Sequence, residues 1–445
     1  MPSFPDRVVM QTSFMRGSDA LATSITTIAI PLLVLTTTGS AALTGLAFVL
    51  EWLPRLLAFS IGGPLVDRFG ADRVFRLATA ARATLLAAAG GVLSDLPATG
   101  TATTAVVMTI GALSGLLSQS SFVAVETFGA AASRAAGNQA HRVQSVQISI
   151  DQGALLIGPL LAGLLLTQGP VVMLLVAAGL STAAACSTIR CDDTLSPAGV
   201  SGPFMVLSGL RSGWRTVRSV PALGWLVLGL VASNLALAVT QASSPITVLH
   251  HFGGSSLTAG AVWSAAGVVS LAAVAASRRA IDRFGLWSVG ATGAVMACSA
   301  CLAVGFAPAL DLYAVTIGVL MAGEGALTVV LRTLRARLIP ASAFGSALSV
   351  TIVLVVIPMP VAGALVAALP APALPTLLLS CAVLQGLAMT AAFRGLWRHR
   401  SSYATPASQP TAAPCEAHPH DTAPPTKGDL TAPQNAADTP LSTLR

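Results

Sequence analysis

Charged residues are scarce in this chain: only 9% of its 445 residues are Asp, Glu, Lys or Arg. A soluble protein needs about a quarter of its residues to be charged. Hydrophobic residues reach 54%, and the mean hydropathy is +0.78. The shortage of charge excludes an ordinary soluble globular protein and indicates a chain that is solvated mostly by lipid.

The chain also has little lysine, histidine and cysteine. Lys427 is its one lysine, and no basic patch interleaved with aromatic residues occurs, so the net charge of +7 does not indicate nucleic-acid binding. Cys298 and Cys301 have the spacing of a metal or redox motif, but no histidine or acid accompanies them in their apolar run. His418 and His420 lie in a polar tail. We therefore expect neither a metal site nor a cofactor.

Motifs of ATP-driven and enzymatic proteins are missing. No Gly-x-x-x-x-Gly-Lys-Ser/Thr sequence occurs, which excludes an ATP-driven pump for this chain alone. No histidine falls inside an expected membrane helix. No spaced pair of acids that includes a Gly-Asp turn occurs there either, so an intramembrane enzyme is not expected. Aromatic residues make up 5%, with two tyrosines, which disfavours a sugar carrier with its polar and aromatic site.

Long apolar runs are what the sequence has in abundance. Twelve of them are about 20 residues long, the length that spans a bilayer as a helix. The chain is therefore expected to be an all-α polytopic membrane protein. The expected helices are 13–35, 41–62, 75–94, 105–128, 143–167 and 170–188 in the first half, and 223–248, 257–277, 286–307, 312–333, 343–369 and 373–393 in the second.

These runs divide the chain into five expected parts. The linker between the halves carries Arg211, Trp214, Arg215 and Arg218 at helical spacing, which predicts a short amphipathic helix on the membrane surface. The tail is rich in Pro, Thr, Ala and Ser and is expected to be disordered. The parts are a cytoplasmic N-terminus (1–12), a six-helix bundle (13–189), a cytoplasmic linker (190–220), a second six-helix bundle (221–395) and a cytoplasmic tail (396–445).

Arginines gather on one side of the expected helices. The loops on the other side, 36–40, 95–104, 168–169, 249–256, 308–311 and 370–372, contain no Lys or Arg. Basic loops stay in the cytoplasm, so both termini are expected on the cytoplasmic side of the membrane. The membrane itself is expected to be the plasma membrane. Abundant Ala and Arg with a single Lys suggest a bacterial source. The arginines on the basic side are Arg68, Arg73, Arg134, Arg142, Arg211, Arg215, Arg218, Arg279, Arg283, Arg335, Arg337, Arg398 and Arg400.

One polar sequence occurs in both halves. Asp67-Arg68-Phe69-Gly70 follows the second expected helix, and Asp282-Arg283-Phe284-Gly285 follows the eighth. The segments before the fifth and eleventh helices also correspond, since in each a basic helix end is followed by a short turn and by the start of the next membrane helix. The halves are therefore expected to be parallel six-helix repeats, as in secondary transporters that rock one half against the other.

This motif resembles the cytoplasmic motif between helices two and three of the major facilitator superfamily. Asp72 stands where the family usually has a base, and Arg278 stands where the second copy would need a glycine. The resemblance covers about residues 10–395 and implies twelve helices in two bundles around a midplane cavity. Asp67 can act as a latch by pairing with a base or with a helix N-terminus of the opposite bundle, and a plain charged turn is the alternative. The matching residues are Gly63, Asp67, Arg68, Gly70 and Arg73, with Asp282, Arg283 and Gly285 in the second copy.

The expected fifth helix carries Gly153, Gly158, Pro159 and Gly163. Glycines at this spacing make a flat face for close helix contact, and Pro159 weakens the local hydrogen bonds. The Gly-Pro-x-x-x-Gly core partly resembles the antiporter motif of proton-coupled exporters in the same superfamily. A general packing face is the alternative.

Ionisable residues inside the expected helices are costly and by default mark function. Glu51 and Arg55 are four residues apart and can neutralise each other. Arg82 can reach the membrane surface or pair with Asp19. The full set is Arg16, Asp19, Glu51, Arg55, Arg82, Asp151 and Glu324, of which the last two have no base at helical spacing in their own helices.

Proton-coupled drug exporters of the superfamily place an acid in helix five near an arginine of helix one, and another acid in helix ten. Asp151, Arg16 and Glu324 stand at those places. The resemblance implies proton coupling through Asp151 and Arg16 and substrate binding at Glu324; Asp19 is a further candidate for proton coupling and Glu51 for substrate binding. Glycines on both sides of Glu324 would leave room for a ligand. A purely structural role for the acids is the alternative.

The expected function is that of a monomeric secondary transporter and not of an enzyme. Its layout is most similar to the macrolide- and multidrug-efflux branch, which implies export of a lipophilic drug, antibiotic or metabolite by proton antiport. A siderophore or metabolite exporter of the same fold is the first alternative, and a non-transporting membrane receptor is the second. A receptor would not need the buried acids, so substrate-dependent proton flux separates the two classes.

Overall fold

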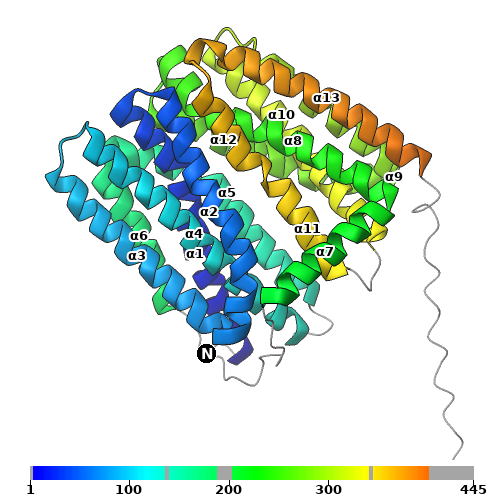
Figure 1. The fold of residues 1–445 in the computed structure, drawn as a ribbon, viewed down its shortest axis with the longest axis horizontal. Helices are drawn as coiled ribbons and strands as arrows, with labels where there is room; N and C mark the ends of the chain where they lie inside the picture. The colour runs from blue at the N-terminus through cyan, green and yellow to red at the C-terminus, as the bar shows by residue number, and fades with distance from the viewer. Residues whose placement is uncertain (1–3, 136–139, 188–202, 340–343, 400–445) are drawn as a thin grey trace, which may run out of the picture. The chain divides into compact units, whose positions relative to one another are not determined.

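The computed structural model describes residues 4–135, 140–187, 203–339 and 344–399 (Figure 1). Some side chains within the helices also lie outside this description, that of Asp67 among them. The residues after 399 lie outside the described part, so the expected disorder of the tail remains a prediction.

The first half of the chain forms helices joined by short turns. A helix satisfies its backbone hydrogen bonds internally, and this is what an apolar segment needs in lipid. The helices are α1 (Phe4–Thr38), α2 (Ala41–Phe69), α3 (Ala71–Asp95), α4 (Thr101–Ala135), α5 (Ala140–Gln168) and α6 (Pro170–Cys186).

The second half begins with α7 (Pro203–Ser219), the helix expected in the linker. Its exposed Trp214 lies beneath the guanidinium of Arg218, 5.2 Å from the ring centroid. Two short segments, η3 (Thr247–His251) and η5 (Ala371–Ala373), have π and 3-10 geometry. The remaining helices are α8 (Pro221–Ile246), α9 (Ser256–Val304), α10 (Leu310–Leu338), α11 (Phe344–Val356), α12 (Pro358–Ala368) and α13 (Leu374–Arg398).

The described residues contain 11 helical stretches that are long and apolar enough to cross a membrane. Two of them, Ser256–Ser277 and Arg279–Val304, belong to α9, and a third, Val350–Ala368, combines α11 with α12. Pro170–Cys186 is a shorter apolar helix. Together these are the twelve expected membrane segments, and the fold is the expected all-α polytopic architecture.

One expected helix is divided in the structure. The expected segment 343–369 is divided at Ile357, because Pro358 and Pro360 have no N–H for the helical hydrogen-bond pattern. The eighth and ninth expected helices, both within α9, are separated by a kink at Gly285, where the backbone is not helical.

The turns at Gly70 and Gly285 are conformational copies of each other. Both glycines have φ of 83°, which residues with a side chain rarely adopt, and their ψ angles are 146° and 159°. The arginine two residues earlier lies over the next phenylalanine in each copy, at 5.2 Å for Arg68 and 5.4 Å for Arg283. The repeated sequence therefore has a repeated backbone geometry.

The helices pack as two bundles, α1–α6 and α8–α13 (Figure 1). Within the first, α3 packs on α6 and α2 on α4; within the second, α10 packs on α9 and α13 on α8. Between the bundles, α2 contacts α12 and α5 contacts α9. We call the end with the turns at Gly70 and Gly285 the arginine-bearing end, and the end with the turns at Gly39, Gly169 and Gly253 the opposite end.

Candidate functional site

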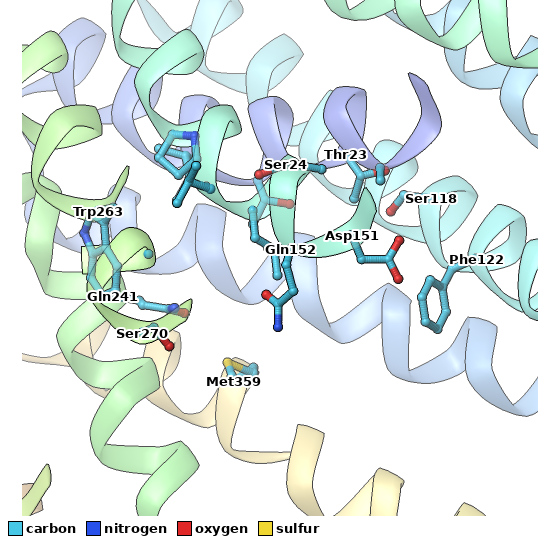
Figure 2. A pocket seen from close by; sticks show the side chains of 18 of the residues that line it. Thr23, Ser24, Ser118, Phe122, Asp151, Gln152, Gln241, Trp263, Ser270 and Met359 are labelled. Carbon is cyan, nitrogen blue, oxygen red and sulfur yellow. The ribbon is translucent and has the colours of Figure 1, made fainter. Parts of the chain in front are cut away.

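A cavity of about 580 Å³ lies between the two bundles. Its walls come from α1, α2, α4 and α5 on one side and from α8, α9, α10 and α12 on the other. Figure 2 shows Gln152 of α5 and Met359 of α12 pointing into this space. Phe122, Trp263 and Leu271 contribute large apolar surfaces to the wall. The cavity is thus mostly apolar, with a few polar groups.

Arg16 of α1 is the centre of an ionic cluster at the cavity wall. Its Nε lies 2.8 Å from Asp151 Oδ1, and its Nη2 lies 2.5 Å from Asp151 Oδ2. The same Nη2 lies 2.5 Å from Glu126 Oε1 of α4. The arginine side chain is 6% exposed, whereas those of Asp151 and Glu126 are 33% and 49% exposed. One buried cation is therefore shared by two carboxylates that water can reach.

The contact between Arg16 and Asp151 is the one that the family resemblance implied. Glu126 was not among the expected site residues, although it is an acid within the expected helix 105–128. Arg332 of α10 also lines the cavity and was not expected either. The sequence signal for both was the same as for the others, an ionisable residue inside an apolar run.

Asp19 and Arg82 form a second pair, in which Arg82 is fully buried and Asp19 lines the cavity. Arg82 Nη2 lies 2.6 Å from Asp19 Oδ1, and its other nitrogens donate to Thr23 at 2.6 Å and to Ser181 at 3.0 Å. Ser121 donates to the remaining oxygen of Asp19 at 2.9 Å. Arg82 thus pairs with Asp19 instead of reaching the membrane surface. The pair ties four helices of the first bundle together.

Glu51 and Arg55 neutralise each other, as the spacing allowed. Arg55 Nη2 lies 2.7 Å from Glu51 Oε1 and 2.7 Å from Thr27 Oγ1, and the guanidinium stacks 4.5 Å above Trp52. Arg55 and Trp52 line the cavity, whereas Glu51 is buried and does not. The expected substrate contact of Glu51 is therefore replaced here by a contact with Arg55.

Glu324 does not line the cavity either. It accepts hydrogen bonds from Ser233 of α8 and from Gln385 of α13, the latter at 3.2 Å. The expected room beside it is filled: a Cβ on Gly323 would overlap the backbone of Ala297, and one on Gly325 would overlap Ser270. These glycines serve close helix packing, and Glu324 joins three helices of the second bundle.

The glycines of α5 also serve packing. A Cβ on Gly158 would overlap Ser24 of α1, and one on Gly163 would overlap the backbone of Ser256 at the start of α9. Pro159 contacts α9 through its carbonyl, which a Cβ on Gly260 would overlap. Gly153 differs, because a Cβ there would meet nothing within 4 Å. Gly158, Pro159 and Gly163 thus lie in close contacts between helices, as the packing interpretation of this motif expects.

The two bundles meet tightly near the opposite end. In addition to the α5–α9 contact, a Cβ on Gly45 of α2 would overlap the backbone of Ala367 of α12. A hydrogen bond also joins the bundles: Leu160 N–H donates to Ser264 Oγ at 2.9 Å. Glycine contacts thus seal the opposite end on both sides of the cavity.

The repeated turn motif lies at the arginine-bearing end. Arg68, Arg73, Asp282 and Arg283 are exposed there, and none forms an ion pair with another described residue. The side chain of Asp67 lies outside the described part, so its role as a latch remains a prediction.

Comparisons with known proteins agree with this architecture. A sequence model of the Major Facilitator Superfamily matches residues 12–363, and no protein of curated function matches significantly. The fold is similar to a variant of the nucleoside transporter NupG, with a TM-score of 0.70 at 12% identity over 86% of this chain and 99% of that one. A bacterial homologue of the iron transporter ferroportin, inward-facing, has a TM-score of 0.68 at 14% identity over 89% and 100% of the two chains. An inward-facing bacterial homologue of the human lysosomal transporter Spinster has 0.67 at 13% identity over 91% and 100%.

Proposed function

This chain belongs to the Major Facilitator Superfamily and is a multi-pass membrane transporter, and from this premise we propose that it exports a lipophilic small molecule in exchange for protons. The observation that carries the proposal is the ionic cluster of Arg16, Asp151 and Glu126 in the wall of an apolar cavity between the bundles. The cavity offers a place for the compound, and the cluster offers a place for the proton.

The composition of the cavity wall supports a lipophilic substrate. A volume of about 580 Å³ lies within the roughly 300–1,000 Å³ of small-molecule sites. Phe122, Trp263 and Met321 offer apolar contact area, while Gln152 and Gln241 offer a few hydrogen bonds that can orient a ligand. The ionic side chains at the wall are mostly engaged with one another, which leaves apolar contact as the main source of affinity.

The charge of the cluster supports proton exchange. Two carboxylates share one guanidinium, so the ionised cluster has one negative charge in excess. A proton on either carboxylate would remove that excess charge. An arginine favours the charged form of a carboxylate beside it. If rocking of the bundles moves Arg16 relative to Asp151, proton affinity changes with conformation, which is what coupling requires.

The glycine seal supports an assignment of the conformation. With the bundles held together near the opposite end, access to the cavity comes from the arginine-bearing end. The positive-inside rule puts that end in the cytoplasm, with both termini. We therefore propose that the structure is a cytoplasm-facing state of a plasma-membrane protein, ready to load the compound that it exports.

Substrate-dependent proton movement tests the proposal. Inside-out vesicles carrying the purified protein are acidified, and a panel of lipophilic compounds is added; a transported compound should release protons from the vesicles. Vesicles with Asp95→Asn, which changes an exposed acid outside the cavity, should respond in the same way. Accumulation of the compound against its own gradient that continues with the proton gradient collapsed would show that the proposal is wrong.

A further inference from the structure

A second cavity of about 580 Å³ lies between α9 and α13 and shares no lining residue with the cavity between the bundles. Trp287 lines it from the second part of α9, just after the turn at Gly285. Phe393 and Trp397 line it near the end of α13. The cavity is therefore a groove at the arginine-bearing end, between two membrane-spanning helices of one bundle.

The groove opens on the surface that faces lipid. Val295 in its wall is 68% exposed, and Leu387 beside it on α13 is 66% exposed. Apolar side chains with this exposure, on helices long enough to span a membrane, are covered by lipid chains. Ala294 and Gly386, both small, form part of the wall and leave the groove open.

Aromatic rings mark the depth of the groove in the bilayer. The Trp287 ring centroid lies 5.0 Å from that of Phe393 and 5.2 Å from that of Trp397. Tryptophans gather at the level of the lipid headgroups, where one side of the ring is apolar and the other is wet. The part of the groove that these rings line thus lies at headgroup depth.

Two arginines at that depth are suited to bind an anionic ligand. Arg394 and Arg398 both line the groove, are both exposed, and are four residues apart on α13. Neither forms an ion pair with any described residue. Like charges at this spacing on a helix repel each other. An anion that lies between them removes the repulsion and forms charge-assisted hydrogen bonds with both guanidinium groups.

We propose that this groove binds one anionic phospholipid. The phosphate lies between Arg394 and Arg398, and an acyl chain follows the groove past Val295 and Gly386. Basic pockets between membrane helices bind anionic headgroups in this way. The site is independent of the transport cavity and of the proposed export function.

Lipid titration of the full-length protein in detergent tests the proposal. Binding of phosphatidylglycerol is compared with binding of phosphatidylcholine and of glycerol phosphate by native mass spectrometry. Each arginine near an anionic lipid contributes roughly fivefold to affinity, so phosphatidylglycerol should bind at least about tenfold more tightly than phosphatidylcholine. Equal binding of the two lipids, or binding of glycerol phosphate as tight as that of the lipid, would overturn the proposal.

Three variants locate the site. The pair Arg394→Gln and Arg398→Gln should remove the preference for phosphatidylglycerol. Gly386→Leu should weaken both lipids, because a Cβ there meets nothing within 4 Å and the larger side chain fills the groove without a clash. Arg211→Gln with Arg215→Gln removes the same charge, also four residues apart, from α7 and should leave the preference intact. If the α7 variant loses the preference as fully as the α13 variant, the site is wrongly placed.

Discussion

Arg16 binds Asp151 through two nitrogens at once, with Nε 2.8 Å from Oδ1 and Nη2 2.5 Å from Oδ2. This parallel pairing fits the planar guanidinium group and fixes the orientation of the carboxylate. Glu126 approaches the same Nη2 at 2.5 Å, so both carboxylates contact one guanidinium group. The Arg16–Asp151 contact joins α1 to α5, so it depends on how these two helices lie against each other.

Arg16→Lys tests the geometry of this pair. A lysine keeps the charge but cannot form the two parallel hydrogen bonds. We expect transport to slow at least about tenfold, measured as initial rates in proteoliposomes, with a melting temperature close to that of the parent protein. Arg76→Lys in α3, outside the cavity lining, is the matched control and should transport normally. Normal rates for Arg16→Lys would mean that only charge matters here.

Arg82→Met should act on stability. Arg82 is fully buried and donates to Asp19, Thr23 and Ser181, so its removal leaves a buried carboxylate without its cation. Breaking such a pair costs about 3–5 kcal/mol, which should appear as a large fall in thermal stability. Arg73→Met removes an exposed arginine and should change stability by about 0.5 kcal/mol or less. Equal losses of thermal stability in the two variants would contradict the assignment of Arg82 to a buried ion pair.

The fold could be predicted well because its main signal is local. Apolar runs of spanning length and the repeated Asp-Arg-Phe-Gly sequence depend on neighbouring residues alone, and the structure confirms the twelve segments and the matching turns at Gly70 and Gly285. The break at Ile357 had a local signal as well, in Pro358 and Pro360, which the expected helix 343–369 passed over.

The site was harder, because depth in the membrane does not determine which way a side chain points. Glu51, Asp151 and Glu324 all lie inside apolar helices, but only Asp151 lines the cavity. Rotation of each helix about its axis decides this, and that rotation depends on packing against distant helices. Glu126 shows the same limit, since its importance becomes visible only when α1 brings Arg16 beside it.

Gly163→Ala should open the seal near the opposite end. The new Cβ would overlap the Ser256 carbonyl, whereas that of Gly153→Ala in the same helix meets nothing within 4 Å. Spin labels at Thr36→Cys and Ser255→Cys, in a cysteine-free background, report the distance between the bundles there. We expect longer distances and slower transport for Gly163→Ala alone. Unchanged distances in both variants would show that the glycine contact does not control closure.

Asp67→Asn tests the latch at the arginine-bearing end. A latch biases the balance between two conformations, so turnover should fall several-fold while substrate affinity stays within about threefold. Asp282→Asn changes the exposed acid of the degraded second copy and should have the smaller effect. A loss of affinity of a hundredfold or more in folded Asp67→Asn would place Asp67 in the binding site instead.

The central claim is that Asp151 carries the coupled proton, and Asp151→Asn in proteoliposomes tests it most directly. Asparagine fixes a neutral side chain at the cluster, so the proton gradient should no longer drive accumulation of substrate, while exchange of labelled for unlabelled substrate should persist. The two assays on one preparation separate lost coupling from lost folding. If Asp151→Asn still concentrates substrate against its gradient in a pH-dependent way, the proton is carried by another group and the account is contradicted.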